Sequence, residues 1–265
     1  VHTGSESPLI QLFDSLVPEN LKWVSLYWVF ALIALAMVVV IQLVKFPTVE
    51  LKEDEKMDTG RAFRELLANR KVLLFFLGIF AYVGTEQGIA NWMVKFLQTY
   101  HGVDPASMGA TVISNFWGLL TIGCLLGLAL LKLFDSQKVL MLFTAGAIAS
   151  LLTALFGSLE VAVIAFPMAG FFASVMWSII VSLALNSVPH HHGTFSGILC
   201  SGIAGGAVIP LIVGGLAEWV GLRLAMLFIL VTLGYIFSIG LWAKPLVKNE
   251  TVRFRELFRK NGRVH

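Results

Sequence analysis

Charged residues are scarce in this sequence. Only 13% of its 265 residues are Asp, Glu, Lys or Arg, whereas 57% are hydrophobic. A soluble globular domain carries about 25% charged residues, so this composition has too few polar groups to cover its apolar surface in water. The scarcity of charge excludes an ordinary soluble protein and predicts one that is solvated by lipid.

Cysteines and enzymatic motifs are scarce as well. Cys124 and Cys200 both lie inside hydrophobic runs, which is typical of buried structural thiols and not of a disulfide framework or a zinc site. The run His190–His192 points its side chains in different directions and has no Cys, Asp or Glu nearby. The sequence also has no P-loop, HExxH or GxSxG motif. We therefore predict no enzyme, no catalytic residue, no cofactor, no metal and no nucleic-acid partner.

Long hydrophobic runs are what the sequence has in abundance. A membrane-spanning helix needs about 20 mostly apolar residues, because its backbone must satisfy its own hydrogen bonds in lipid. The short alternating segments of a barrel are not seen. We predict an all-α membrane protein with seven transmembrane helices. The seven runs are Trp23–Val44, Val72–Val94, Met108–Leu131, Val139–Gly157, Val161–Val188, Phe195–Leu216 and Leu224–Ala243.

The basic residues are distributed unequally between the two ends of these runs. If successive connections alternate between the sides, 16 of the 19 Lys and Arg residues fall on one side, and only Lys22, Lys95 and Arg223 on the other. The positive-inside rule makes the richer side cytoplasmic. We expect a multi-pass protein of the inner (cytoplasmic) membrane, with its N-terminus outside and its C-terminus inside. A polar N-terminal segment on the far side also leads us to expect further spans upstream.

The charge pattern divides the chain into five parts. We predict an extracytoplasmic loop (1–22), one transmembrane helix (23–44), a cytoplasmic inter-domain linker (45–71), a six-helix bundle (72–243) and a basic cytoplasmic tail (244–265). The linker is the longest internal connection. The tail is expected to lie near anionic membrane lipid.

The six helices of the bundle have an internal similarity. The middle helix of the first three contains Gly118–Gly123, and the middle helix of the second three contains Gly197–Gly202. Both segments follow the pattern Gly-x-Leu-x-x-Gly although their helices run in opposite directions. We predict two inverted three-helix repeats, as transporter halves often have.

Glu86 is the sharpest functional candidate because it is the one ionisable residue inside a predicted span. A carboxylate at mid-bilayer costs about 2.5–3.5 kcal/mol on insertion scales, so it should face a bundle interior or a water-filled cavity. Gln87 and Asn91 are four residues apart and share a helix face, and Trp92 follows. Amides beside an aromatic ring suit a sugar. The alternative is that Glu86 only pairs with a neighbouring helix.

Two further spans contain polar or aromatic candidates. Asn115 either reaches a cavity or bonds across helices. Trp177 lies near the middle of its span, where it is a candidate for stacking on a ligand. It lies beside a stripe of small residues that we interpret mainly as a helix-packing seam. The members of the stripe are Gly170, Ser174, Ser178, Ser182 and Asn186.

Several of these segments together resemble a known family. Tyr82–Trp92 resembles the seventh helix of sugar:proton symporters of the fucose/glucose–galactose type, in the major facilitator superfamily. Ser182–Asn186, His192–Gly193 and Gly205–Pro210 look like the tenth and eleventh helices of that family. Phe134–Lys138 is similar to its degenerate motif between helices eight and nine, without the usual final glycine.

The resemblance implies that the seven spans are helices six to twelve of a twelve-helix major facilitator fold, whose N-terminal six-helix half would be a partner. It also implies a hexose-like sugar as substrate and a proton as the coupling ion. Glu86 would contact substrate or take part in proton coupling. The candidate substrate-binding residues are Glu86, Gln87, Asn91, Trp92, Asn115 and Trp177.

Other functions remain as alternatives. A major facilitator transporter of a drug, lipid or other metabolite would have the same fold. A seven-helix receptor or retinal protein is disfavoured, because a retinal protein needs a Schiff-base lysine in its last helix and Leu224–Ala243 contains none.

Overall fold

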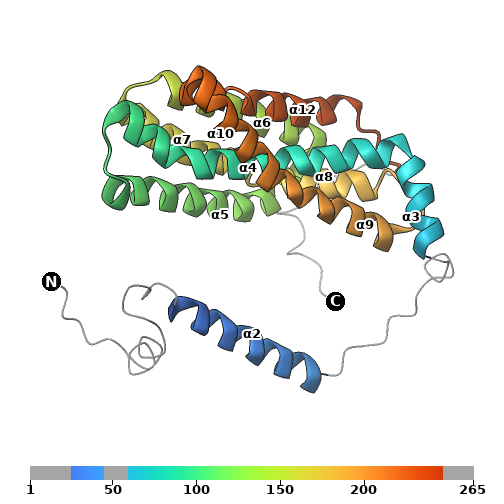
Figure 1. The fold of residues 1–265 in the computed structure, drawn as a ribbon. Helices are drawn as coiled ribbons and strands as arrows, with labels where there is room; N and C mark the ends of the chain where they lie inside the picture. The colour runs from blue at the N-terminus through green and yellow to red at the C-terminus, as the bar shows by residue number, and fades with distance from the viewer. Residues whose placement is uncertain (1–24, 45–58, 247–265) are drawn as a thin grey trace, which may run out of the picture. The chain divides into compact units, whose positions relative to one another are not determined.

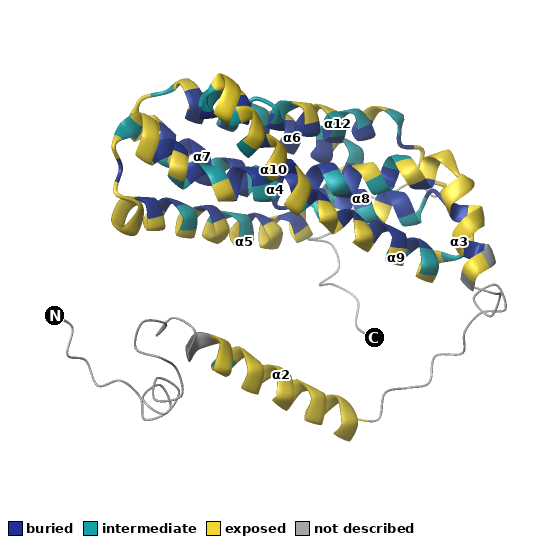
Figure 2. Ribbon diagram, viewed as in Figure 1, coloured by how far each residue is buried: buried dark blue, intermediate teal, exposed yellow. Residues whose placement is uncertain are grey.

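A computed structural model of the chain describes residues 25–44 and 59–246. The chain divides into two units, Val1–Leu51 and Lys52–His265. The predicted loop 1–22, most of the linker and most of the tail lie outside the described residues, as does Trp23 at the start of the first predicted span. Within the first unit, the described residues form the apolar helix α2 (Ser25–Leu43), whose side chains are almost all exposed (Figure 2).

The described part of the second unit is a helical bundle (Figure 1). Six of its helical stretches are long and apolar enough to cross a membrane, and they correspond to the last six predicted spans. The apolar part of α2 is shorter. The elements are α3 (Thr59–Ala68), α4 (Arg70–His101), η3 (Pro105–Gly109), α5 (Ala110–Leu133), α6 (Ser136–Phe156), α7 (Leu159–Ala173), α8 (Met176–Leu185), α9 (His192–Ser201), η4 (Gly202–Ala204), α10 (Gly205–Val220), α11 (Leu222–Met226) and α12 (Ile229–Trp242).

Local sequence signals explain where several helices begin and end. The side chain of Asn69 accepts a hydrogen bond from the backbone N–H of Lys71 and caps the start of α4. Gly102 ends α4 in the left-handed conformation, at φ 67°, where glycine has no steric penalty. Asp135 caps α6 by accepting from the backbone N–H groups of Gln137 and Lys138.

Helix α4 lies in the interior of the bundle and packs against α10, α12 and α8 (Figures 1 and 2). Its side chains Phe75, Ile79 and Met93 are fully buried or nearly so. Midway along it, the hydroxyl groups of Thr85 and Thr232 form a buried hydrogen bond of 2.6 Å to α12. Because its neighbours hold α4 in place, the polar side chains in the middle of this helix have fixed positions.

Three predicted spans are each divided in the structure. The span Val161–Val188 is α7 followed by α8, with a turn at Ser174–Val175, and the span Leu224–Ala243 is α11 followed by α12. A 3₁₀ turn, η4, separates α9 from α10. At the first break, the Ser174 hydroxyl donates to the carbonyl of Phe171 at 2.7 Å, and such local bonds compete with a regular helix. Hydropathy alone does not reveal these breaks.

The two glycine patterns occupy matching positions in the bundle. A Cβ atom at Gly118 or at Gly197 would meet nothing within 4 Å. Gly123, in contrast, packs against Ser174 at the α7–α8 break, and Gly202 packs against α4. The middle helix of each three-helix group thus contacts the first helix of the other group, which agrees with the predicted inverted repeat.

Candidate functional site

Glu86 is half-buried near the middle of α4 and is hydrogen-bonded by two neighbours on the same helix. The Tyr82 hydroxyl donates to Glu86 Oε2 at 2.5 Å, and Gln87 Nε2 donates to Oε1 at 3.3 Å. Tyr82 precedes Glu86 by four residues, which places both side chains on one face. The carboxylate therefore has a donor on each oxygen while part of it stays open to a ligand or to water.

Two other helices lie close to this part of α4. The rings of Tyr82 and Trp177 on α8 lie 6.0 Å apart at 59°. Cys124 on α5 donates its thiol to the carbonyl of Ser174, at the break before α8, at 3.3 Å. We call Tyr82, Glu86, Cys124 and Trp177 the Glu86 group. It combines a carboxylate, a phenol, a thiol and an indole from three helices.

Gln87 and Asn91 extend the polar surface of α4 away from the Glu86 group. Asn91 is exposed and donates from Nδ2 to the carbonyl of Gln87 at 2.8 Å. The Gln87 side chain lies against Gly206 of α10, where an added Cβ would be 3.0 Å from its Cγ. The structure therefore brings Glu86, Gln87 and Asn91 together along one helix, and Trp177 lies against Tyr82 one turn before Glu86.

Trp92 contacts α10 instead of the Glu86 group. Its Nε1 donates to the carbonyl of Pro210 at 3.0 Å. Its ring lies against Gly214, where an added Cβ would approach the ring carbon Cζ2 to 2.8 Å. The polar atom of this side chain thus joins two helices, so substrate binding by Trp92 stays a prediction while an interhelical role is visible.

Asn115 lies on the opposite side of α5 from Cys124. Nine residues separate the two, and at about 100° per residue they point about 180° apart. Asn115 lines a recess of about 380 Å³ together with Val163, Ile164 and Pro167 of α7. The structure does not bring Asn115 to the Glu86 group, and its contact with substrate stays a prediction.

The small-residue stripe is only partly a packing seam. Gly170 packs against Phe116 and Ser174 against Gly123, as expected of a seam. Ser178 and Ser182 are exposed, however, so the stripe leaves the interface after the α7–α8 break. Among the described residues, the predicted packing seam is therefore seen in the first part of the stripe, and for the second part it stays a prediction.

Two members of the Glu86 group were not among the predicted site residues. Tyr82 follows from the four-residue spacing, since i and i+4 side chains meet on a helix. Cys124 has no such signal, because a thiol inside a hydrophobic run looks the same whether it packs in a core or faces a cavity.

These features define the class of the protein. Six apolar helices that hold a hydrogen-bonded carboxylate at mid-span are typical of an integral membrane transporter. Residues 9–202 match the Major Facilitator Superfamily, and the chain belongs to this family. The family expected from the sequence is confirmed.

Curated relatives come from this same group of proteins. The chain is 32% identical over 221 residues to the "Glucose/galactose transporter" of Brucella abortus biovar 1, a match that covers 81% of this chain and 52% of the relative. It is 32% identical over 184 residues to a "Putative glucose/galactose transporter" of Helicobacter pylori strain J99, covering 69% and 44%. The chain spans about half the length of the curated relatives it matches.

Solved structures show the same fold. The chain superposes on the Escherichia coli fucose:proton symporter, FucP, with a TM-score of 0.68 and 20% identity, covering 91% of this chain and 62% of that one. A structure of FucP in the outward conformation gives a TM-score of 0.70 at 21% identity, with coverage of 91% and 61%. The predicted all-α major facilitator fold is therefore confirmed.

Proposed function

We propose that this chain is the C-terminal half of a secondary transporter that moves a hexose across the cytoplasmic membrane together with protons. The names of the relatives in Brucella and Helicobacter support glucose or galactose as the cargo. The fold shared with a fucose:proton symporter supports proton coupling. The abundance of basic residues in the connections at one side supports a cytoplasmic location for the end at which α4 begins.

The geometry of the Glu86 group carries this proposal. A sugar presents hydroxyl groups around its edge and apolar C–H groups on its faces. Glu86 and Gln87, both half-buried, supply a carboxylate and an amide for the hydroxyls, and the half-buried ring of Trp177 supplies a flat surface for a C–H face, while the buried Tyr82 holds the carboxylate in place. Small-molecule sites characteristically have a few polar groups that converge beside aromatic rings.

Glu86 has a further role within this proposal. Both oxygens of Glu86 accept a hydrogen bond, from Tyr82 and from Gln87, whereas a protonated carboxyl would itself donate one. Protonation would therefore change which hydrogen bonds Glu86 accepts and donates, and with them its hydrogen bond to a sugar hydroxyl. This links substrate contact and proton coupling at one residue, whether Glu86 transports the proton itself or senses it.

Alternating access would be completed by the N-terminal half. In this mechanism two six-helix bundles rock around a site between them. Broken helices near such a site allow small local movements. The α7–α8 break contacts Cys124, and η4 and the start of α10 pack against α4 between Phe76 and Gln87, the stretch that contains Glu86. Both breaks are thus placed to respond when the Glu86 group binds substrate.

Transport itself provides the test. The full-length protein, reconstituted into proteoliposomes, is given labelled D-glucose or D-galactose under an imposed pH gradient, acid outside. We expect uptake that requires the gradient and collapses when a protonophore is added. If neither sugar is taken up at any gradient, the substrate assignment is overturned. If uptake is unchanged by the protonophore, the proton coupling is overturned.

A further inference from the structure

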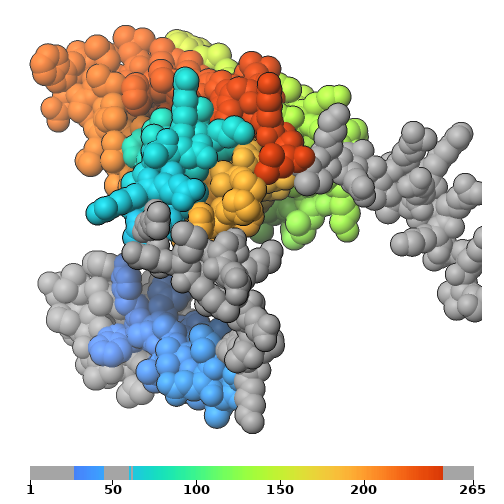
Figure 3. All heavy atoms as spheres, turned by 90° about the vertical axis from the view of Figure 1, so that its right-hand side faces the viewer, coloured from blue at the N-terminus to red at the C-terminus, as the bar shows by residue number. Residues whose placement is uncertain are grey.

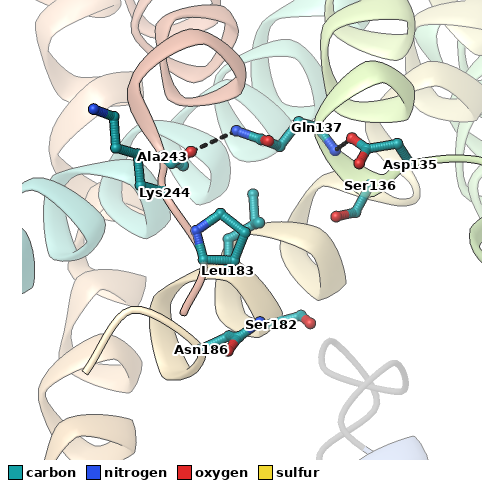
Figure 4. Close-up of a pocket in the computed structure, with 9 residues that line it drawn as sticks. Asp135, Ser136, Gln137, Ser182, Leu183, Asn186, Ala243 and Lys244 are labelled. Atoms are coloured by element: carbon teal, nitrogen blue, oxygen red, sulfur yellow. Dashed lines mark hydrogen bonds between the residues drawn. The ribbon is translucent and has the colours of Figure 1, made fainter. Parts of the chain in front are cut away.

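A second polar cavity lies away from the Glu86 group, at the end of the bundle where α4 begins (Figure 4). Its volume is about 410 Å³, within the range of about 300–1,000 Å³ that is usual for small-molecule sites. It is formed where the α5–α6 turn, the last turn of α8 and the segment after α12 meet. Figure 3 views the same end of this unit, with α3 in cyan and the end of α12 in red. The lining residues are Asp135, Ser136, Gln137, Ser182, Leu183, Asn186, Ala243, Lys244 and Pro245.

The walls of this cavity are held in place by hydrogen bonds. Asp135 accepts from two backbone N–H groups through a single oxygen, Oδ1. Gln137 donates from Nε2 to the carbonyls of Gly240 at 3.3 Å and Ala243 at 2.6 Å, which ties the start of α6 to the end of α12 (Figure 4). The backbone N–H of Leu246 donates to the carbonyl of Asn186 at 2.8 Å, which closes the segment after α12 onto α8. Such a preorganised site loses little conformational entropy when a ligand binds.

The chemistry of the walls suits a neutral molecule with several hydroxyl groups. Asp135 Oδ2 and Gln137 Oε1 are acceptors beyond the bonds that fix these side chains. The Ser182 hydroxyl donates or accepts, whereas the Lys244 amine points away from the other lining side chains (Figure 4). Leu183 gives an apolar patch. The proposed sugar contacts at mid-span use similar groups: the carboxylate of Glu86, the neighbouring amide of Gln87 and the ring of Trp177.

The same helix leads from the Glu86 group to this cavity. Trp177 contacts the Glu86 group, and Ser178 and Ser182 follow on one exposed stripe of α8. Ser178 lies about 6 Å before Ser182 at 1.5 Å of rise per residue. In the proposed orientation this direction runs from mid-bilayer towards the cytoplasm, which is the way that an imported sugar leaves.

We propose that this cavity is a second monosaccharide site, at the cytoplasmic end of the transporter. It receives the same class of sugar as the Glu86 group, so the inference rests on the proposed function. It is nevertheless a separate site, because it shares no residue with the Glu86 group and takes its lining from the last turn of α8, the start of α6 and the segment after α12.

Thiol protection tests this site. Ser182→Cys is introduced into the full-length transporter together with Glu86→Gln, which disables the first site, and the purified protein is alkylated with a maleimide. Label at position 182 is counted by peptide mass, apart from Cys124 and Cys200. We expect D-glucose or D-galactose to slow alkylation at 182, and an equal osmolarity of glycine betaine to leave it unchanged.

Two further variants sharpen the result. Ser178→Cys is the matched control, because Ser178 is exposed on the same helix one turn earlier and does not line the cavity. In the Glu86→Gln background it should gain no protection. Asp135→Asn keeps an N-cap residue but removes the charge. It should raise the sugar concentration for half-protection at 182 by roughly tenfold, since a charged hydrogen bond becomes a neutral one.

The outcomes separate this proposal from the proposed function. Equal alkylation of position 182 with and without sugar would overturn the second site, even if the intact transporter takes up hexose. A cysteine at 182 that never reacts would also overturn it, because the cavity would be filled in the whole protein. Absence of gradient-driven uptake in proteoliposomes bears instead on the proposed function.

Discussion

Helices α4 and α5 follow each other in the chain and differ sharply in burial. In the most apolar 18-residue window of each span, 61% of the residues of α4 are buried, against 17% of the span Pro105–Leu133 that contains α5. The less buried span is the more apolar of the two. In a water-soluble protein, the more apolar of two helices would be expected to be the more buried one. In a bilayer, lipid solvates apolar side chains as well as a protein interior does, so apolarity marks a span and not a core.

What marks the buried helix is close packing and hydrogen bonding to other helices. α4 contains Gly84, Thr85 and Trp92, each in contact with a neighbouring helix. α5 offers a residue of each type as a counterpart that is exposed, namely Gly118, Thr121 and Trp117. Identical substitutions in the two helices therefore test the comparison directly.

The largest difference is expected for glycine to leucine. At Gly84 an added Cβ would collide with Ile209 and lie 3.2 Å from the carbonyl oxygen of Gly205, so α10 would have to move. Overpacking of this kind costs about 1–3 kcal/mol. Gly84→Leu should reduce the yield of folded transporter in size-exclusion chromatography, whereas Gly118→Leu should not, because nothing lies within 4 Å of its Cβ. Equal yields would show that α4 is not tightly packed.

Threonine to valine should have the next largest effect. Thr232 donates its hydroxyl to the carbonyl of Ile229 at 2.7 Å, so Thr85 is the donor in the 2.6 Å bond between the two threonines. Thr85→Val should lower the free energy of unfolding by about 1–2 kcal/mol. Thr121→Val removes only a bond to its own helix, at the Trp117 carbonyl, and should have little effect. Chemical unfolding in mixed micelles measures both variants, and similar losses would contradict the assignment.

A smaller effect is expected for tryptophan to phenylalanine. Trp92→Phe keeps an aromatic ring against Gly214 but removes the bond to the Pro210 carbonyl. Interhelical bonds in membranes contribute about 0.6 kcal/mol on average. Trp117→Phe, on a side chain that is 37% exposed, should change the same unfolding measurement less. A larger loss at position 117 would mean that this face of α5 is buried in the whole transporter.

The smallest effect concerns the connection between the two helices. The Ser107 hydroxyl and the Ala106 backbone N–H donate to Asp104 and hold the pKa of its carboxyl below the ordinary value. A lowered folded pKa adds stability above the unfolded pKa, about 3.9, and this stability is lost as pH falls through the folded pKa. The protection of the backbone amides at the start of η3, measured as the exchange rate relative to the intrinsic rate at the same pH, should therefore fall in acid. The Asp104→Asn variant, which cannot titrate, should not show the change.

Much of the fold was predictable because span length and charge bias are physical constraints on any membrane helix. The predicted span Val139–Gly157 is helix Ser136–Phe156 in the structure. The predicted end at Val94 was early, since α4 continues to His101. Hydropathy detects only the residues inside the hydrocarbon core of the bilayer, whereas the helix itself continues beyond that core.

The site was predictable only where a residue is unusual for its environment. Glu86 stands out because a charge at mid-bilayer is costly. Asn115 and Cys124 could not be assigned to faces of α5, because that helix is apolar all round and its sequence does not reveal which side meets protein. The structure shows how α5 is rotated: Cys124 faces Ser174 at the α7–α8 break, and Asn115 faces a recess lined by α7.

The central claim is that Glu86 is part of the substrate site and that transport requires its carboxylate. Glu86→Gln removes the charge and keeps the shape, and Glu160→Gln does the same at an exposed carboxylate at the start of α7. Both variants are compared with the unmodified full-length transporter in gradient-driven hexose uptake. The account predicts that Glu86→Gln falls to background while Glu160→Gln retains uptake. Unchanged uptake by a correctly folded Glu86→Gln variant would contradict it.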